Sequence, residues 1–369
     1  MARTPIAQSL ETIAAEAAAE RGLTRRDLLR NAGALGVAAA GTTTIGRLIA
    51  AAEGAAAPRT VVVGAGLAGL TAAYRLKQAG INAEVHEASD RVGGRCWTIR
   101  EAFAEEQIAE HGGELIDQGH TAIRHLANEL ELKLDNLLQA EANGTEPTYN
   151  FDGQPYSYVE ATADLKEVWR KIHSDVSAAS YPTLYNVSTP RGVELDRMSI
   201  VDWIEESVPG GMSSPLGQLL DVAYTIEYGA DSSEQSSLNL LPLPGYRGQG
   251  QLRIFGPSNE KYRVAGGNDQ IAARLAEQVA GQITLGSALV SIRLRADGAY
   301  TLTFEQGSAT KKVTAERVIL ALPFSILRSS VDISKAGFSA RKRTAIRELG
   351  MGTNSKLHVQ FNTRHWNSL

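Results

Sequence analysis

A glycine-rich turn between a short apolar run and a helical segment constrains the fold of this chain most. Residues 60–63 are threonine followed by three valines, a pattern that predicts a buried parallel strand. The turn Gly64-Ala65-Gly66-Leu67-Ala68-Gly69 follows, and apolar residues at helical spacing then continue to Gly80. A second expected strand over residues 83–87 ends in an acid. Strand, glycine turn, helix, strand and acid in this order are typical of a βαβ unit that binds a dinucleotide.

Each glycine of the turn has a separate physical role in such a unit. Gly64 permits the tight turn, Gly66 lets the backbone approach the pyrophosphate, and Gly69 lets the helix pack closely on the strand. The helix begins at Leu67 and Ala68, where free N–H groups and the positive end of the helix dipole favour phosphate. The turn is therefore predicted to hold the pyrophosphate of the ligand.

The residues directly after the second strand extend this predicted phosphate site. Glu87 can accept hydrogen bonds from the hydroxyls of an adenosine ribose, and its charge would repel the 2′-phosphate of NADP. Ala88 follows, and residues 91–95 then contain two arginines and two glycines. Since a guanidinium suits bidentate contact with phosphate, we expect Gly94 and Arg95 to contact the same pyrophosphate.

Together with later motifs, these residues resemble the flavin-containing amine oxidase family, which includes monoamine oxidases, L-amino-acid oxidases and polyamine oxidases. The resemblance covers most of residues 58–369 and also rests on residues 111–114, 318–323 and 354–359. It implies FAD as the cofactor. The implied fold is α/β, with a discontinuous Rossmann-like FAD-binding domain and an inserted, mainly helical substrate domain.

The same resemblance implies roles for five further positions. The family places the backbone at Gly112, Gly113 and Glu114 against the flavin ring, and it contacts adenine through a strand that matches Leu289. The position of Lys356 matches a lysine that holds a water against flavin N5. An ammonium there would help to position oxygen or water while the flavin is reoxidised, so Lys356 is the expected catalytic residue.

The implied reaction is oxidative deamination of a primary amine or an L-amino acid. A neutral amine gives a hydride equivalent to the flavin, the resulting imine is hydrolysed by water, and O₂ leaves as hydrogen peroxide. The sequence does not determine which amine or amino acid is the substrate. Glu114 could favour a cationic substrate, or it could contact the cofactor or its surroundings, while Arg247 or Arg253 could hold a carboxylate. With Cys96 as the single cysteine and no ligand spacing, no metal site is expected.

Five segments are expected along the chain. Prolines and amphipathic helical patterns mix between residues 140 and 250, whereas strand patterns return afterwards, with an Asp297-Gly298 hairpin turn. The expected segments are a signal and linker (1–57), the first part of the FAD-binding domain (58–139), the substrate domain (140–250), the second part of the FAD-binding domain (251–330), and an incomplete return to the substrate domain (331–369).

The first 57 residues resemble a twin-arginine export signal. Arg25 and Arg26 precede an uncharged stretch, residues 32–46, and three alanines stand before Pro58 as a cleavage site. The stretch is too short to span a bilayer comfortably. We therefore expect export to the periplasm, the cell envelope or the outside of the cell, and no stable membrane span.

The charge balance excludes a basic nucleic-acid-binding protein. Lys and Arg number 37 against 41 Asp and Glu, a formal net charge of −4. The partners expected are a small amine or amino-acid substrate and O₂, and a homodimer is compatible with the sequence.

Two alternatives to an active oxidase stay open. Lys356, His358 and Gln360 alternate with apolar residues in an expected strand, but family members continue beyond the position of Leu369. The chain could thus be a truncated, non-catalytic nucleotide-binding fragment, and we expect no amine turnover by residues 1–369 alone. Another FAD oxidoreductase, such as a carotenoid desaturase, is disfavoured by the strand that carries Lys356.

Overall fold

The computed structural model describes residues 58–140, 146–180, 183–245 and 252–364. Residues 58–369 form one unit by their internal contacts, and the fold below is that of this unit. The expected export signal with Arg25 and Arg26 lies outside the described residues, as does Arg247.

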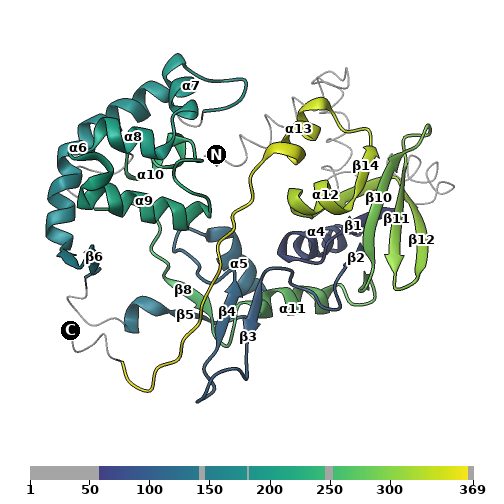
Figure 1. Cartoon of the computed structure of the whole chain (residues 1–369). Helices are drawn as coiled ribbons and strands as arrows, with labels where there is room; N and C mark the ends of the chain where they lie inside the picture. The colour runs from purple at the N-terminus through teal and green to yellow at the C-terminus, as the bar shows by residue number, and fades with distance from the viewer. Residues whose placement is uncertain (1–57, 141–145, 181–182, 246–251, 365–369) are drawn as a thin grey trace, which may run out of the picture. The chain divides into compact units, whose positions relative to one another are not determined.

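A parallel sheet contains the predicted βαβ unit (Figure 1). Val61 and Val62 of its strand β1 are completely buried, as expected for a central strand with both faces covered. The strand order is β13-β1-β2-β9, with each neighbouring pair parallel. Because β13 pairs with β1 from more than 250 residues away, the expected discontinuous α/β domain is confirmed. The elements are β1 (Thr60–Val63), α4 (Leu67–Gln78), β2 (Ala83–His86), β9 (Ile283–Thr284) and β13 (Arg317–Leu320).

The second sheet is mainly antiparallel and has the order β12-β11-β10-β14. The Asp297-Gly298 turn joins β10 and β11, as predicted, whereas β12 and β14 were not predicted from the sequence. Its core residues pack with Val61 and Val63 of β1, and Val62 packs with the cluster that includes residues of α4 and α11. The bounds are β10 (Ala288–Leu294), β11 (Tyr300–Gln306), β12 (Ala309–Ala315), β14 (Asp332–Lys335) and α11 (Asp269–Gln278).

Two short antiparallel pairs lie outside these two sheets. Strand β3 pairs with β4, and β5 pairs with β8, which arrives from well over a hundred residues later in the register Leu134 to Val264. The elements are β3 (Trp97–Ile99), β4 (Ala109–Gly112), α5 (Thr121–Glu129), β5 (Leu134–Asn136), the 3₁₀ turn η1 (Leu137–Ala140) and β8 (Tyr262–Val264).

The helical region has a hydrophobic core of its own, drawn from residues between Tyr156 and Ile254. Ser157 and Ser199 begin helices with complete capping boxes, which satisfy backbone donors at those ends. The elements are β6 (Tyr149–Phe151), β7 (Gln154–Tyr156), α6 (Tyr158–Ala179), α7 (Pro190–Arg197), α8 (Ile200–Ser207), η2 (Gly211–Ser213), α9 (Pro215–Tyr228), η3 (Ser237–Asn239) and α10 (Pro242–Gly245).

The C-terminal segment departs from the prediction. After α12 (Phe324–Ser330) and α13 (Ala340–Glu348), residues 351–361 form no strand, and none of the described strands pairs with them. Polar and apolar residues do alternate here, but the apolar side chains are exposed and two of the polar ones are partly buried, the reverse of a strand that packs on a core. Leu357 is 89% exposed, whereas His358 and Gln360 are half-buried. The predicted strand around Lys356 is therefore wrong for this structure, because no neighbouring strand supplies its ladder.

No helix in the described ranges is both long enough and apolar enough to cross a lipid bilayer.

Candidate functional site

Packing explains two of the three glycines in the turn after β1. Gly64 has φ +98°, and a Cβ there would lie 2.7 Å from the carbonyl oxygen of Ala321. A Cβ on Gly69 would lie 1.9 Å from the carbonyl oxygen of Gly64. Since no side chain tolerates such distances, both glycines are required by the close approach of β1, α4 and the residue after β13.

Packing does not explain the third glycine. Gly66 has φ −75°, which any residue adopts, and a Cβ there would come no closer than 4.0 Å to other protein atoms. It is the N-cap of α4, and no side chain caps this helix or places an acid in its first turn. The N–H groups of Leu67 and Ala68 thus begin a helix with open space in front of it, which fits a pyrophosphate.

The second glycine loop lies against the first. Gly93 donates to the carbonyl of Ala65 at 2.8 Å and pairs with Gly66, so Gly94 approaches Gly66 closely. Arg91 is occupied within the loop, where it donates to the carbonyls of Val92 and Gly94. Arg95 is exposed, and its guanidinium contacts only a sulfur, that of Met351 at 3.9 Å, among the described residues. Arg95 is therefore the guanidinium of this loop that is available to a phosphate.

Glu87 lies directly behind the glycine turn. One oxygen of its carboxylate accepts from the Ala65 N–H at 2.6 Å, and the other accepts from the N–H and hydroxyl of Ser89. The turn that leads into β10 is bonded to the same stretch, because Ser287 donates to the Glu87 carbonyl at 2.7 Å. Leu289, 6% exposed, follows in β10. The residues expected at the adenosine end, with the exposed Ala88, therefore come together.

The turn at the end of β4 is held against the second glycine loop. Gly113 has φ +67°, and a Cβ on Gly112 would lie 2.9 Å from the Arg95 carbonyl oxygen. Gly113 also packs on Cys96, whose thiol is buried. Burial, with the Glu110 and Asp269 carboxylates, raises the pKa of Cys96 to about 11. The thiol is thus a neutral packing group at ordinary pH.

Asn268, which sequence reasoning missed, fixes this turn from behind. Its side-chain amide donates to the carbonyls of Gly113 at 2.6 Å and Glu114 at 2.7 Å. Its amide oxygen accepts from the Val264 N–H, and its own N–H donates to Glu110. With 2% exposure, Asn268 ties β8 and the start of α11 to the predicted flavin contact. The sequence signal that could have found it is the glycine pair Gly266-Gly267, directly before Asn268 and α11.

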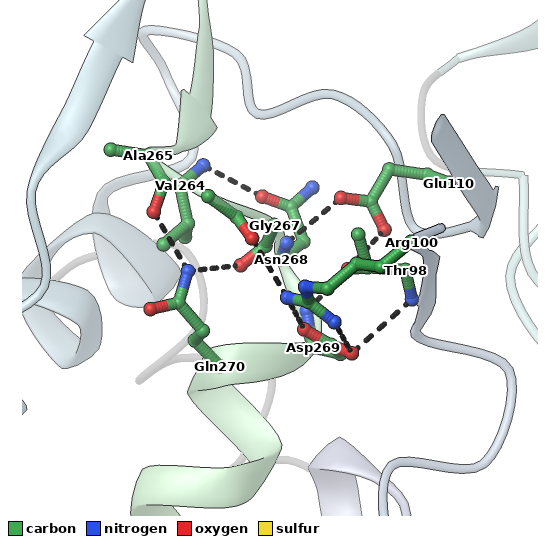
Figure 2. Close-up of polar contacts among 10 residues, drawn as sticks. Thr98, Arg100, Glu110, Val264, Ala265, Gly267, Asn268, Asp269 and Gln270 are labelled. Carbon is green, nitrogen blue, oxygen red and sulfur yellow. Dashed lines mark hydrogen bonds and ion pairs between the residues drawn. The ribbon is translucent and has the colours of Figure 1, made fainter. Parts of the chain in front are cut away.

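Glu110 and Asp269 complete this buried network (Figure 2). Glu110, 4% exposed, accepts from the Thr98 hydroxyl at 2.9 Å. Asp269 forms a two-point ion pair with Arg100, at 2.8 Å for both contacts. Burial works to raise the pKa of Asp269, but the hydrogen bonds from Arg100 and Thr98 outweigh it and the pKa is lowered. The network holds β3, β4 and α11 in one arrangement.

Lys356 reaches this same turn. Its ammonium forms an ion pair with the Glu114 carboxylate and donates to the Glu110 carbonyl at 3.2 Å. Both side chains are partly exposed. The segment before Lys356 is tied to the end of α9, where Asn354 donates to the Ile226 carbonyl at 2.6 Å. The structure thus brings the expected catalytic lysine to the expected flavin contact, through a pairing with Glu114 that the sequence did not predict.

These residues fit FAD on structural grounds. Gly66 leaves space that its own packing does not require, and α4 begins without a cap or an acid. Arg95 is exposed in the loop that packs against Gly66, and hydrogen bonds from the buried Asn268 fix the Gly112–Gly113 backbone turn. A cradle for phosphates and a rigid backbone turn are what a flavin dinucleotide requires.

Comparison with known proteins identifies the family of this chain. The family model "Flavin containing amine oxidoreductase" matches residues 67–369. Polyamine oxidase 7 of Oryza sativa subsp. japonica is 25% identical over 85% of this chain and 65% of its own length. A putative flavin-containing monoamine oxidase of Mycobacterium tuberculosis is 30% identical over 71% of this chain and 56% of its own. L-amino-acid oxidase of Notechis scutatus scutatus is 26% identical over 83% and 58%.

Solved structures share the fold. Putrescine oxidase bound to putrescine has a TM-score of 0.63 at 22% identity, covering 80% of this chain and 64% of that one. Cyclohexylamine oxidase from Brevibacterium oxydans has a TM-score of 0.62 at 20% identity, covering 79% and 63%. The chain spans less than two thirds of the length of these relatives. Its sequence, its fold and its nucleotide cradle place this chain in the flavin-containing amine oxidoreductase family, whose cofactor is FAD.

Proposed function

We propose that this protein oxidises a primary amine or an amino acid with FAD, and that O₂ accepts the electrons and is released as hydrogen peroxide. The observation that carries the proposal is the meeting of Lys356 with the Gly112–Glu114 turn, beside a cradle that fits a dinucleotide. Relatives named as polyamine, monoamine and L-amino-acid oxidases support the reaction class.

FAD, when bound, supplies the two-electron acceptor for the hydride of the amine carbon. The role of the protein residues is to hold the flavin and to orient the amine next to it. The carbonyls of Gly113 and Glu114 are fixed by Asn268, so the backbone presented to the ring cannot rearrange freely. Polar groups that are already fixed in place stabilise a transition state more than groups that must reorganise during the reaction.

Lys356 supplies a positioned positive charge at the same turn. An ammonium has three N–H donors, and Lys356 uses two of them, on Glu114 and on the Glu110 carbonyl. The third is available to a water or to O₂. The Glu114 carboxylate keeps the ammonium in place.

One observation favours the alternative of a nucleotide-binding chain without turnover. The apolar side chains of Leu357 and Val359, next to Lys356, are 89% and 58% exposed. Efficient hydride transfer requires a site from which bulk water is excluded. The described residues do not cover this side of the segment.

Measurements of FAD binding and peroxide release on the purified chain distinguish these two functions. FAD binding together with peroxide release, when a panel of amines and amino acids is added, would support the oxidase and would overturn the expectation that residues 1–369 alone turn over no amine. Bound FAD without peroxide would favour the alternative. Failure to bind FAD would contradict both.

A further inference from the structure

An apolar pocket of about 670 Å³ lies between hairpin β6–β7, helix α9 and residues 252–259. This is the size of pockets that bind small molecules, roughly 300–1,000 Å³. Tyr149 and Phe151 of the hairpin, Ile226 of α9 and Phe255 contribute to its lining. Ile226 is 62% exposed and Phe255 is 38% exposed, so large apolar side chains are left uncovered here. An aromatic or large aliphatic group would cover them.

Arg253 is the cation of this pocket. Its neighbours Leu252 and Ile254 are buried, at 8% and 6% exposure, whereas Arg253 itself is exposed and lines the pocket. Within the described residues its guanidinium has no hydrogen bond, ion pair or ring contact, and none of the described lining residues is an acid. By contrast, Arg100 and Arg191 pair with carboxylates. An unpaired guanidinium beside an aromatic surface matches a ligand that carries a carboxylate on an apolar body.

The pocket is joined to the Lys356 site on two sides. The carbonyl of Ile226 accepts a hydrogen bond from Asn354, two residues before Lys356. Ser258, which also lines the pocket, donates to Asp117 at 2.9 Å, three residues after Glu114. Lys356 is therefore two residues from Asn354, and Glu114 is three residues from Asp117. Both Asn354 and Asp117 are hydrogen-bonded to residues that line the pocket.

Negatively charged side chains, opposite in sign to Arg253, lie behind the part of the pocket lining that contains Ser258. Asp117 accepts from the Ser258 hydroxyl and from the N–H groups of Asn259 and Glu260. Burial raises the pKa of Glu260, and the nearby charges of Asp117, Glu114 and Glu227 raise it further. An apolar pocket with a guanidinium in its lining and carboxylates behind one wall complements a zwitterion better than it complements a simple amine.

We propose that this pocket binds the apolar side chain and the carboxylate of an amino-acid substrate, and that Arg253 binds the carboxylate. This inference rests on the proposed function and narrows its substrate class to amino acids with large apolar or aromatic side chains. Arg253 is thereby the residue that distinguishes an amino acid from an amine of the same shape.

The test measures binding to the complete chain by titration calorimetry, so it does not depend on turnover. The probes are 3-phenylpropanoate and 3-phenylpropanamide, which share a shape and differ in charge. We expect the acid to bind at least about tenfold more tightly, the effect of one charge-assisted hydrogen-bonded pair. Arg253→Gln removes this preference, Arg253→Lys restores part of it, and Arg293→Gln, an exposed arginine of β10 outside the pocket, leaves it unchanged.

Equal affinity for the two probes, no binding of either, or an undiminished preference in Arg253→Gln would overturn the proposal. If Arg253→Gln does not fold, the comparison of probes on the unaltered chain and on Arg253→Lys still decides. L-phenylalanine should bind more tightly than 2-phenylethylamine, and the reverse order would reject the substrate class. FAD binding is measured separately on the same protein, so a failure to bind FAD contradicts the proposed function, whereas the probe affinities alone decide the role of the pocket.

Discussion

The three glycines of the turn after β1 are explained by different physical constraints. Gly64 and Gly69 are glycines because backbone oxygens of the protein itself lie where a Cβ would be. Gly66 is under no such constraint. A glycine that packing does not require, at the start of an uncapped helix, is best explained by a ligand that approaches the backbone.

Glu87 should contribute to FAD affinity through its charge. Glu87→Gln keeps the size of the side chain but loses a charged acceptor, which is worth about 1.5–3 kcal/mol in a hydrogen bond. We expect FAD binding, followed by flavin fluorescence, to weaken by about tenfold or more. The matched control is Glu84→Gln, three residues earlier in β2, where the acid pairs with the exposed Arg59. Equal affinities for the Glu87 and Glu84 variants would contradict the role.

Lys356 should act mainly in the step with oxygen. Lys356→Met removes the ammonium at the Gly112–Glu114 turn, and we expect reoxidation of the reduced enzyme to slow by about 100-fold, with a smaller effect on reduction by substrate. Stopped-flow absorbance separates the two steps in an active preparation. Lys342→Met, on the surface of α13, is the control. Normal reoxidation in the Lys356 variant would reject the assignment.

Among the elements, the junction of β4, β8 and α11 determines the shape of the site. A single side chain, Asn268, bonds to Gly113, Glu114 and Val264 from a buried position. Residues more than 150 positions apart are thereby held at one point. The turn expected at the flavin owes its geometry to α11 as much as to its own glycines.

Asn268→Ala should destabilise the protein markedly. The substitution leaves two part-buried carbonyls and one buried N–H without their partner, so we expect the free energy of unfolding to fall by about 3 kcal/mol. Urea unfolding of the chain without FAD measures this. Asn128→Ala, at an exposed position of α5, should change it by less than about 0.5 kcal/mol. A loss at Asn268 no larger than that at Asn128 would show that the network is unimportant.

The local elements were predictable from the sequence, whereas the contacts between them were not. The βαβ unit from Thr60 to Glu87 follows from a run of valines, helical spacing and glycines, all local signals. The pairing of Lys356 with Glu114 joins residues 242 positions apart and has no local signature. The strand expected around Lys356 failed because alternation indicates a strand only where a neighbour can pair with it.

At the scale of the whole molecule, the described chain has three hydrophobic clusters: one in the helical region, and two that cover opposite faces of the parallel sheet. The pieces of the nucleotide cradle come from one end of that sheet, where β1 and β2 end. Parallel sheets bind their ligands at the carboxyl ends of the strands.

We propose that the protein is exported through the twin-arginine route. The support is the Arg25-Arg26 pair before an uncharged stretch, and a protein that must bind a dinucleotide benefits from a route that carries folded proteins. Replacement of both arginines by lysine should leave the precursor in the cytoplasm, as seen by fractionation. Arg30→Lys, in the same segment, is the control. Unaltered export of the double variant would refute the proposal.

The central claim is that the turn after β1 holds FAD, and Gly66→Val tests it most directly. A Cβ at this position comes no closer than 4.0 Å to other protein atoms, so the fold should lose no more than about 1 kcal/mol of stability, while the valine occupies the space left for the pyrophosphate. Equilibrium titration should show one FAD bound to each unaltered chain and at least about a hundredfold weaker binding to the stable variant. FAD bound equally well by Gly66→Val, or not bound by the unaltered chain, would contradict this claim.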